Sequence, residues 1–144
     1  HPVFADYLQA YGRGGLRAHD FGTIDNLARL YWYTVEFGLI GTPQGLKIYG
    51  SGILSSPGES VFSLEDDSPH RLGFDLRRVM RTTYRVDDYQ QLYFVIDSFQ
   101  QLFDETYQDF AALYRELSQN SRQYTPLDLL PDDKIVKKGE QTRT

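Results

Sequence analysis

Apolar residues recur at helical spacing in two segments near the start of the chain, and both segments are predicted to be helices. The first covers residues 2–11 and runs into the glycine-rich residues 12–15, which break it. The second covers residues 24–35, where apolar side chains fall on almost every face of the helix. A helix of that kind is buried on several sides, and Gly38 is expected to cap its end.

Shorter apolar runs, separated by small or acidic residues, predict brief elements in the middle of the chain. Strands are expected over residues 46–49 and 92–96, and the second of these is rich in β-branched and aromatic residues. Short helices are expected over residues 59–64 and 74–80. The small residues of 50–58 predict a loop, or a loop around one helical turn.

A last helix is predicted to follow Ser98, which caps an apolar stripe over residues 99–113 that is interrupted around residues 105–108. Residues 131–144 are polar and are expected to form a solvated tail. The fold class that follows is α+β, mostly helical with short strands, with one domain over residues 1–130.

Composition narrows the classes of function. The net charge is −5 with no long basic run, which argues against nucleic acid as a partner. Cysteine is absent, so disulfides, zinc–thiolate sites and thiol nucleophiles are excluded. No apolar stretch approaches the ~20 residues that cross a bilayer, and no signal peptide is visible. We therefore expect a cytoplasmic protein with no membrane partner.

One acidic residue, Glu36, has almost only aromatic and aliphatic neighbours in the sequence. Glu36 lies within an aromatic and aliphatic run, Tyr-Trp-Tyr-Thr-Val-Glu-Phe-Gly-Leu-Ile, where an ionised carboxylate is costly unless something pairs with it. A cation, an arginine or a metal must hold this carboxylate, or it must stay protonated. The alternative is a core helix whose single acid emerges at the surface. Trp32 precedes Glu36 by four residues, so an α-helix would place both on one face, which is compatible with an aromatic substrate site but not specific to one.

Other candidate chemistry is weaker. His1, His19 and His70 show no spacing that would place two of them on one helix face, so a metal site built from this chain alone is not expected. His19 and His70 are most simply surface residues. Ser55 and Ser56 lie in a glycine-flanked loop but not in a Gly-x-Ser-x-Gly elbow. The glycine-rich stretches lack the ending of a phosphate-binding loop and are interpreted as turns.

Three longer segments, residues 27–39, 48–56 and 93–99, resemble the tetrahydropterin-dependent aromatic amino acid hydroxylases. The opening residues 2–7 are most similar to the single-domain bacterial phenylalanine 4-hydroxylases of that family. The resemblance runs from His1 to about residue 117 in the family's order. It implies part of the hydroxylase catalytic-domain fold, and an enzyme that converts L-phenylalanine to L-tyrosine with O2, ferrous iron and tetrahydrobiopterin.

The resemblance also implies roles for particular residues. The family holds iron with two His and one Glu, and Glu36 matches the position of that Glu. The other matching positions lie beside the substrate or the pterin. Trp32 and Phe37 are near the substrate, Gly52, Ser55 and Glu59 are in the second wall of its pocket, and Ala28 and Tyr31 are beside the pterin.

One family motif is absent. The two iron-binding His belong to a His-x-x-x-x-His helix that ends, in the family, just before the segment matching His1. The chain is therefore expected to be the C-terminal part of a catalytic domain, with the missing N-terminal half as its partner, and to be inactive alone. It lacks the heptad helix of the family's tetramers, so a monomer is expected for the complete protein. The alternative is a non-catalytic helical remnant that binds aromatic ligands or other proteins.

Overall fold

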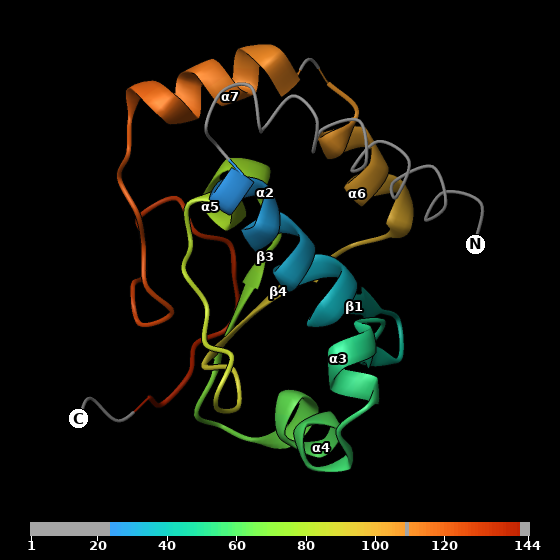
Figure 1. Cartoon of the computed structure of the whole chain (residues 1–144). Coiled ribbons are helices and arrows are strands. Elements are labelled where there is room, and N and C mark those ends of the chain that lie inside the picture. Colours follow the sequence, from blue (N-terminus) through green and yellow to red (C-terminus); the bar gives the residue numbers. More distant parts are fainter. Residues whose placement is uncertain (1–23, 109, 142–144) are drawn as a thin grey trace.

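The computed structural model describes residues 24–108 and 110–141, shown in colour in Figure 1. The helix predicted over residues 2–11, the glycine-rich turn after it, His1 and His19 lie outside the described residues. The positions matched to the iron, the substrate and the pterin all lie within them.

The helix predicted over residues 24–35 is present, but its last turn is not α-helical. Helix α2 (Ile24–Tyr31) continues directly into the π-helix η1 (Trp32–Glu36). The backbone N–H of Phe37 donates to the carbonyl of Trp32 at 2.9 Å, which is an i to i+5 hydrogen bond. Short π-helical turns of this kind are frequent at functional sites.

Gly38 closes this turn, as its predicted capping role requires, because its N–H donates to the Thr34 carbonyl at 3.0 Å. Its backbone is not left-handed, since Gly45 is the residue with a positive φ among those described. Glycine is needed at position 38 for a different reason. A Cβ atom there would collide with the Tyr49 ring and the Thr34 carbonyl oxygen.

A five-stranded sheet of order β2-β1-β4-β3-β5 forms the centre of the structure. β1 and β2 form an antiparallel hairpin, β1 and β3 both run parallel to β4, and β5 is antiparallel to β3. The predicted strands at 46–49 and 92–96 are confirmed, whereas the other three were not predicted. The strands are β1 (Leu39–Thr42), β2 (Gly45–Ile48), β3 (His70–Gly73), β4 (Leu92–Ile96) and β5 (Ile135–Lys137).

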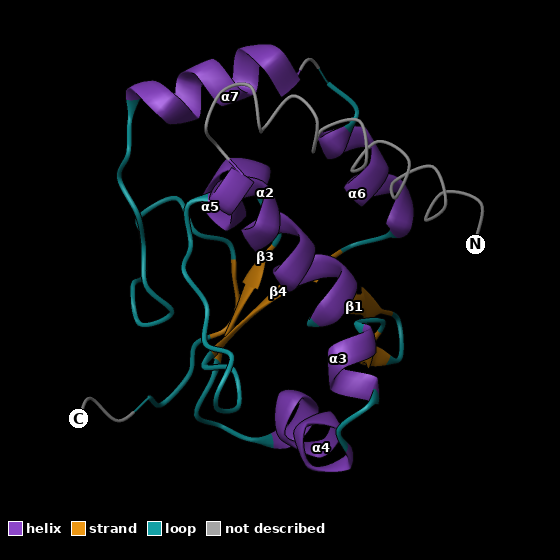
Figure 2. Ribbon diagram, in the orientation of Figure 1, coloured by secondary structure: helices purple, strands orange, loops and turns teal. Residues whose placement is uncertain are grey.

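β4 is buried on both faces, which is typical of a central parallel strand and explains its unbroken apolar sequence. Leu92, Phe94 and Ile96 face a core shared with α2, α5, α6 and α7, while Tyr93 and Val95 face a smaller core shared with α3. Figure 2 shows β3 and β4 passing behind α2, with β1 near α3. The sheet thus separates two apolar layers, and η1 lies where α2 meets α3.

The remaining helices agree with the predicted elements. The loop predicted over 50–58 contains one short helix, and the stripe after Ser98 is split into two helices. Ser56 and Ser98 cap α4 and α6 through their side-chain oxygens. The helices are α3 (Ser51–Leu54), α4 (Pro57–Glu65), α5 (Leu76–Met80), α6 (Phe99–Thr106) and α7 (Phe110–Gln119).

Most residues of the described C-terminal tail are exposed, but the tail is attached to the rest of the fold at several points. β5 pairs with β3, and Asp133 forms a buried ion pair with Arg78 at 2.9 Å. The backbone N–H of Gly139 donates to Nδ1 of His70 at 2.8 Å. His70 is only 4% exposed, so its interpretation as a surface residue was wrong. Burial is the main cause that lowers the pKa of His70 below the ordinary value.

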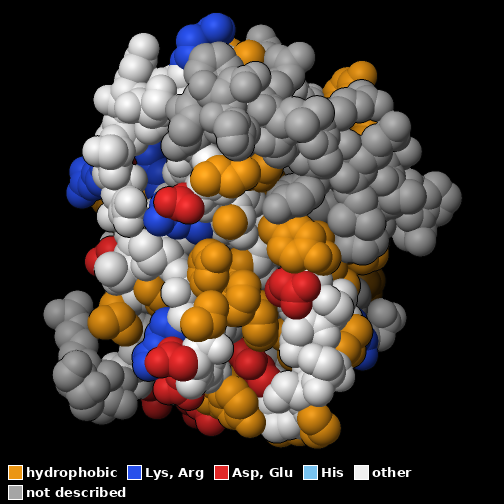
Figure 3. Space-filling view, viewed as in Figure 1, with side chains coloured by type: hydrophobic (Ala, Val, Ile, Leu, Met, Phe, Trp, Pro, Cys, Tyr) orange, Lys and Arg blue, Asp and Glu red, His pale blue; other side chains and the backbone are white. Residues whose placement is uncertain are grey.

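Among the described residues, no helix is long and apolar enough to cross a membrane. Figure 3 shows apolar side chains gathered across the middle of one face, over α2 and α3, with acidic side chains set among them. The candidate site lies in this region of the molecule.

Candidate active site

Trp32 is the centre of an aromatic cluster. Its indole stacks on the Tyr84 ring, with centroids 4.4 Å apart and planes inclined by 12°. The indole also contacts the Phe37 ring, with centroids 4.5 Å apart and planes inclined by 31°. The i to i+5 hydrogen bond of η1 brings Phe37 next to Trp32, because one π-helical turn separates them. Three rings from two segments therefore form one apolar surface.

Glu36 ends η1 and is half-buried. Gly52 of α3 lies against it, because a Cβ built on Gly52 would be 3.0 Å from the Glu36 Oε2 and 3.0 Å from Cε2 of Phe37. A Cβ on Gly50 would collide with the Glu36 backbone carbonyl. The two glycines thus allow α3 to approach the carboxylate closely, as no larger residue would.

The Glu36 carboxylate makes no hydrogen bond or ion pair with the described part of the chain. No arginine holds it there, although an arginine was one of the partners considered from the sequence. A half-buried carboxylate beside an aromatic ring and a glycine is an oxygen donor free to take a ligand.

Glu59 is a second buried acid, 5% exposed, on α4. Its Oε2 accepts hydrogen bonds from the Tyr93 hydroxyl at 2.6 Å and from the Gln90 backbone N–H at 3.0 Å. Burial and the neighbouring carboxylate raise the pKa of Tyr93 far above its ordinary value, so the phenol keeps its proton and remains a donor. One oxygen of this carboxylate is therefore held by two donors within the protein.

Gln90 connects the two parts of the site. Its side-chain oxygen accepts from the Trp32 indole N–H at 3.1 Å, and its amide nitrogen donates to the Arg85 carbonyl at 2.6 Å. Its backbone N–H is the one that Glu59 holds. Gln90 is 2% exposed and lies just before β4. Sequence reasoning missed both Gln90 and Tyr84, because no local pattern marks them.

The other residues matched by resemblance lie around this centre. Ser55 is exposed at the end of α3, and its hydroxyl donates to the Gly52 carbonyl at 3.1 Å. Ala28 and Tyr31 are half-buried on α2, within one turn of Trp32. The structure thus brings Trp32 and Phe37 together with Glu36 and Gly52, while Glu59 joins them through Gln90.

The described residues do not form a complete metal site. None of their His, Asp and Glu side chains come together in a group of three that could hold an ion. His70 is held by the tail, on β3. The Glu36 carboxylate has the chemistry of one oxygen ligand of an iron site, whose other protein ligands would come from outside the described residues.

Comparisons with known proteins give the same family from sequence and from structure. The phenylalanine-4-hydroxylase of Caulobacter vibrioides is 59% identical over 140 residues, which cover 97% of this chain and 47% of that protein. The phenylalanine-4-hydroxylase of Bos taurus is 36% identical over 122 residues, 85% of this chain and 27% of that protein. This chain spans about half the length of its bacterial relatives.

The iron- and phenylalanine-bound crystal structure of phenylalanine hydroxylase from Chromobacterium violaceum superposes with a TM-score of 0.90 at 57% identity. The match covers 94% of this chain and 50% of that one. The α+β fold inferred from the sequence is therefore confirmed, and it corresponds to part of the structure of this enzyme. The sequence profile of the biopterin-dependent aromatic amino acid hydroxylases matches residues 1–140. This chain accordingly belongs to the biopterin-dependent aromatic amino acid hydroxylase family.

Proposed function

We propose that this chain is part of the catalytic domain of a phenylalanine 4-hydroxylase and supplies one iron ligand and two facing walls of the substrate pocket. The observation that carries the proposal is the half-buried Glu36 carboxylate, which lies against Phe37 and Gly52 without a partner in the described part of the chain. The identity to bacterial phenylalanine-4-hydroxylases supports phenylalanine as the substrate.

In this proposal Glu36 binds ferrous iron together with two ligands from outside the described residues. Bound iron and tetrahydrobiopterin supply the activation of O2 that ring hydroxylation needs. Trp32 and Phe37 hold the ring of L-phenylalanine and keep water away from it, since their rings already form one apolar surface. Ala28 and Tyr31 lie beside the pterin.

Gly52, Ser55 and Glu59 complete the opposite wall. Gly52 leaves room for the Glu36 carboxylate, and its carbonyl orients the Ser55 hydroxyl. Glu59 acts through Gln90 and Tyr93, which it holds by hydrogen bonds, and thus fixes the position of the wall that contains Trp32.

The isolated chain is expected to bind iron weakly and to form no tyrosine, because one carboxylate is too few protein ligands for a facial iron site. The test is a chimera in which this chain replaces the matching half of the Chromobacterium violaceum enzyme, which shares 57% identity with it. With Fe(II), reduced pterin and O2, the chimera is expected to convert phenylalanine to tyrosine.

Glu36→Gln in the chimera is expected to reduce iron affinity and tyrosine formation by at least roughly 100-fold, since loss of a direct ligand exceeds the effect of losing its supporting contacts. Glu65→Gln, at the exposed end of α4, is the matched control and is expected to leave both unchanged. A Glu36→Gln chimera that retains iron and activity would refute the assignment. A well-folded chimera that binds no iron even with Glu36 present would favour the non-catalytic remnant.

A further inference from the structure

A cavity lies between α5, the segment around Tyr124 and the docked tail, and Glu36 does not line it. Its volume is about 600 Å³, within the range of small-molecule sites. None of the residues matched to the substrate, the pterin or the iron lines it. Its charged lining comprises four arginines, one lysine and three aspartates: Arg77, Arg78, Arg81, Arg122, Lys134, Asp75, Asp132 and Asp133.

Most of these charges already have partners. Arg78 is held by Asp133 through two hydrogen bonds, at 2.9 and 3.3 Å. Arg77 pairs with Glu116 of α7 at 2.9 Å, and this contact is the main reason that the pKa of Glu116 is lowered. Lys134 lies 3.5 Å from Asp97. The Asp75 side chain caps α5.

Arg81 is one of the exceptions. It is 8% exposed, and its Nε is buried without a hydrogen-bond partner. No ion pair forms between its guanidinium and any described residue, and the nearby Glu116 carboxylate is bonded to Arg77 instead. An arginine cannot lose its charge at ordinary pH, so a largely buried guanidinium whose Nε lacks a hydrogen bond carries an unfavourable desolvation energy that an anion would offset.

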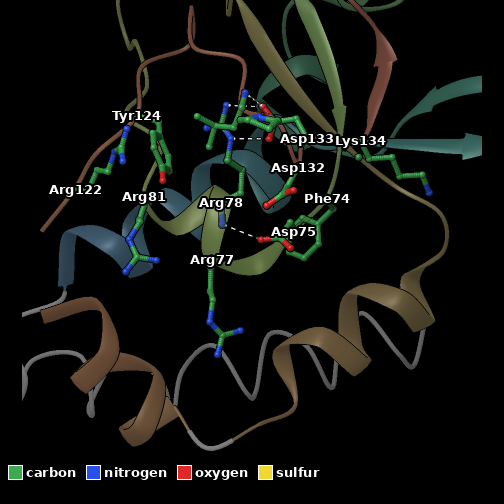
Figure 4. Close-up of a pocket in the computed structure, with 13 residues that line it drawn as sticks. Phe74, Asp75, Arg77, Arg78, Arg81, Arg122, Tyr124, Asp132, Asp133 and Lys134 are labelled. Atoms are coloured by element: carbon green, nitrogen blue, oxygen red, sulfur yellow. Dashed lines mark hydrogen bonds and ion pairs between the residues drawn. The ribbon is translucent and has the colours of Figure 1, made fainter. Parts of the chain in front are cut away.

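Arg122 is a second cation without an acidic partner in the described part of the chain. It lies over the Tyr124 ring, 5.6 Å from the centroid. The backbone holds this segment beside the end of α5, because Tyr124 N–H donates to the Arg81 carbonyl at 2.8 Å. Figure 4 shows Arg81, Arg122 and Tyr124 together on one side of the cavity, with Asp75 and Asp132 on the other.

We propose that this cavity binds a small oxyanion, a carboxylate or phosphate group, on the side that Arg81 and Arg122 line. The planar guanidinium presents paired N–H donors whose geometry matches both groups. The Arg81 side chain is already ordered by burial, so binding costs little further ordering of that side chain.

The test titrates the purified protein with inorganic phosphate and, separately, with acetate, at constant ionic strength set with sodium chloride. Saturable binding by calorimetry, with a matching rise in melting temperature, is expected for at least one of the two anions. The arm that binds identifies the source as a phosphate or a carboxylate. Absence of saturable binding in both arms overturns the proposal.

Arg122→Gln, at an exposed position, is expected to weaken binding at least roughly tenfold, because it removes one of two charge-assisted contacts. Arg81→Gln is expected to abolish saturable binding and, without anion, to melt no lower than the parent protein. Should Arg81→Gln fail to fold, Arg122→Gln decides the question. Arg115→Gln, exposed on α7 and outside the cavity lining, is the control, and an equal loss of binding there would show a diffuse charge effect and refute the site.

Discussion

Replacement of Gln90 tests whether the site is held together by the link between Trp32 and Glu59. Gln90→Leu keeps the approximate size of the side chain and the backbone bond to Glu59. It removes three side-chain hydrogen bonds, with Trp32 at 3.1 Å, Arg85 at 2.6 Å and Asp88 at 3.5 Å. The indole N–H and the Arg85 carbonyl lose their partner. A buried group left unsatisfied costs about 1–3 kcal/mol, so the free energy of unfolding is expected to fall by about that amount.

Trp32 is the single tryptophan of the chain, so its fluorescence reports on this position alone. Urea unfolding followed by tryptophan emission gives the change in stability, and iodide quenching gives the access of solvent to the indole. Both are expected to change in Gln90→Leu, with more quenching because the indole is no longer fixed by its N–H. A loss of 1 kcal/mol corresponds to a melting temperature lower by roughly 2–4 °C for a chain of this size.

Gln119→Leu, exposed at the end of α7, is the matched control and is expected to stay within about 0.5 kcal/mol of the parent protein. If Gln90→Leu unfolds at the same urea concentration as the parent, with unchanged quenching, then Gln90 does not hold Trp32 and the reasoning is wrong.

Two further predictions concern the docked tail. Asp133→Asn removes the negative charge that pairs with Arg78, and the two side chains are 5% and 6% exposed. The substitution is expected to destabilise the protein by about 3–5 kcal/mol in urea unfolding. A loss below 1 kcal/mol would contradict this. His70 has a folded-state pKa below its unfolded value of about 6.5, so the unfolded state binds the proton more readily. The stability that neutral His70 contributes is therefore complete above pH 6.5 and is lost as pH falls towards the folded pKa. Limited proteolysis is expected to cut the tail faster at pH 5 than at pH 7.5, and His70→Gln is expected to flatten this difference.

The elements that could be predicted from the sequence each contain a local sequence pattern typical of a helix or a strand. β4 is an uninterrupted apolar run, and the helices α4 and α6 begin at serine caps. β1, β3 and β5 were not predicted, because each is short and pairs with a strand that is distant in the sequence, β1 and β3 with β4 and β5 with β3. Pairing between distant segments leaves no periodic signal in a short polar or mixed sequence.

The site was predictable only where a residue conflicts with its surroundings. Glu36 stands out as an acid in an aromatic run, and the structure places it half-buried against Gly52. The α-helical spacing suggested Glu36 as the neighbour of Trp32. The π-helical turn instead brings Phe37 against the indole, and no simple sequence rule signals such a turn.

The pairing of β5 with β3 makes the three-residue β5 the edge strand of the sheet in place of β3. Without those three residues, the backbone amides and carbonyls of β3 would be open to strands from other molecules. The edge strand on the opposite side is β2. It is short and bears an exposed lysine, Lys47, and both features discourage pairing with another molecule. The polar C-terminal segment thus protects β3 from pairing with other molecules. A protein trimmed before β5 would be prone to aggregate while its central core stayed intact.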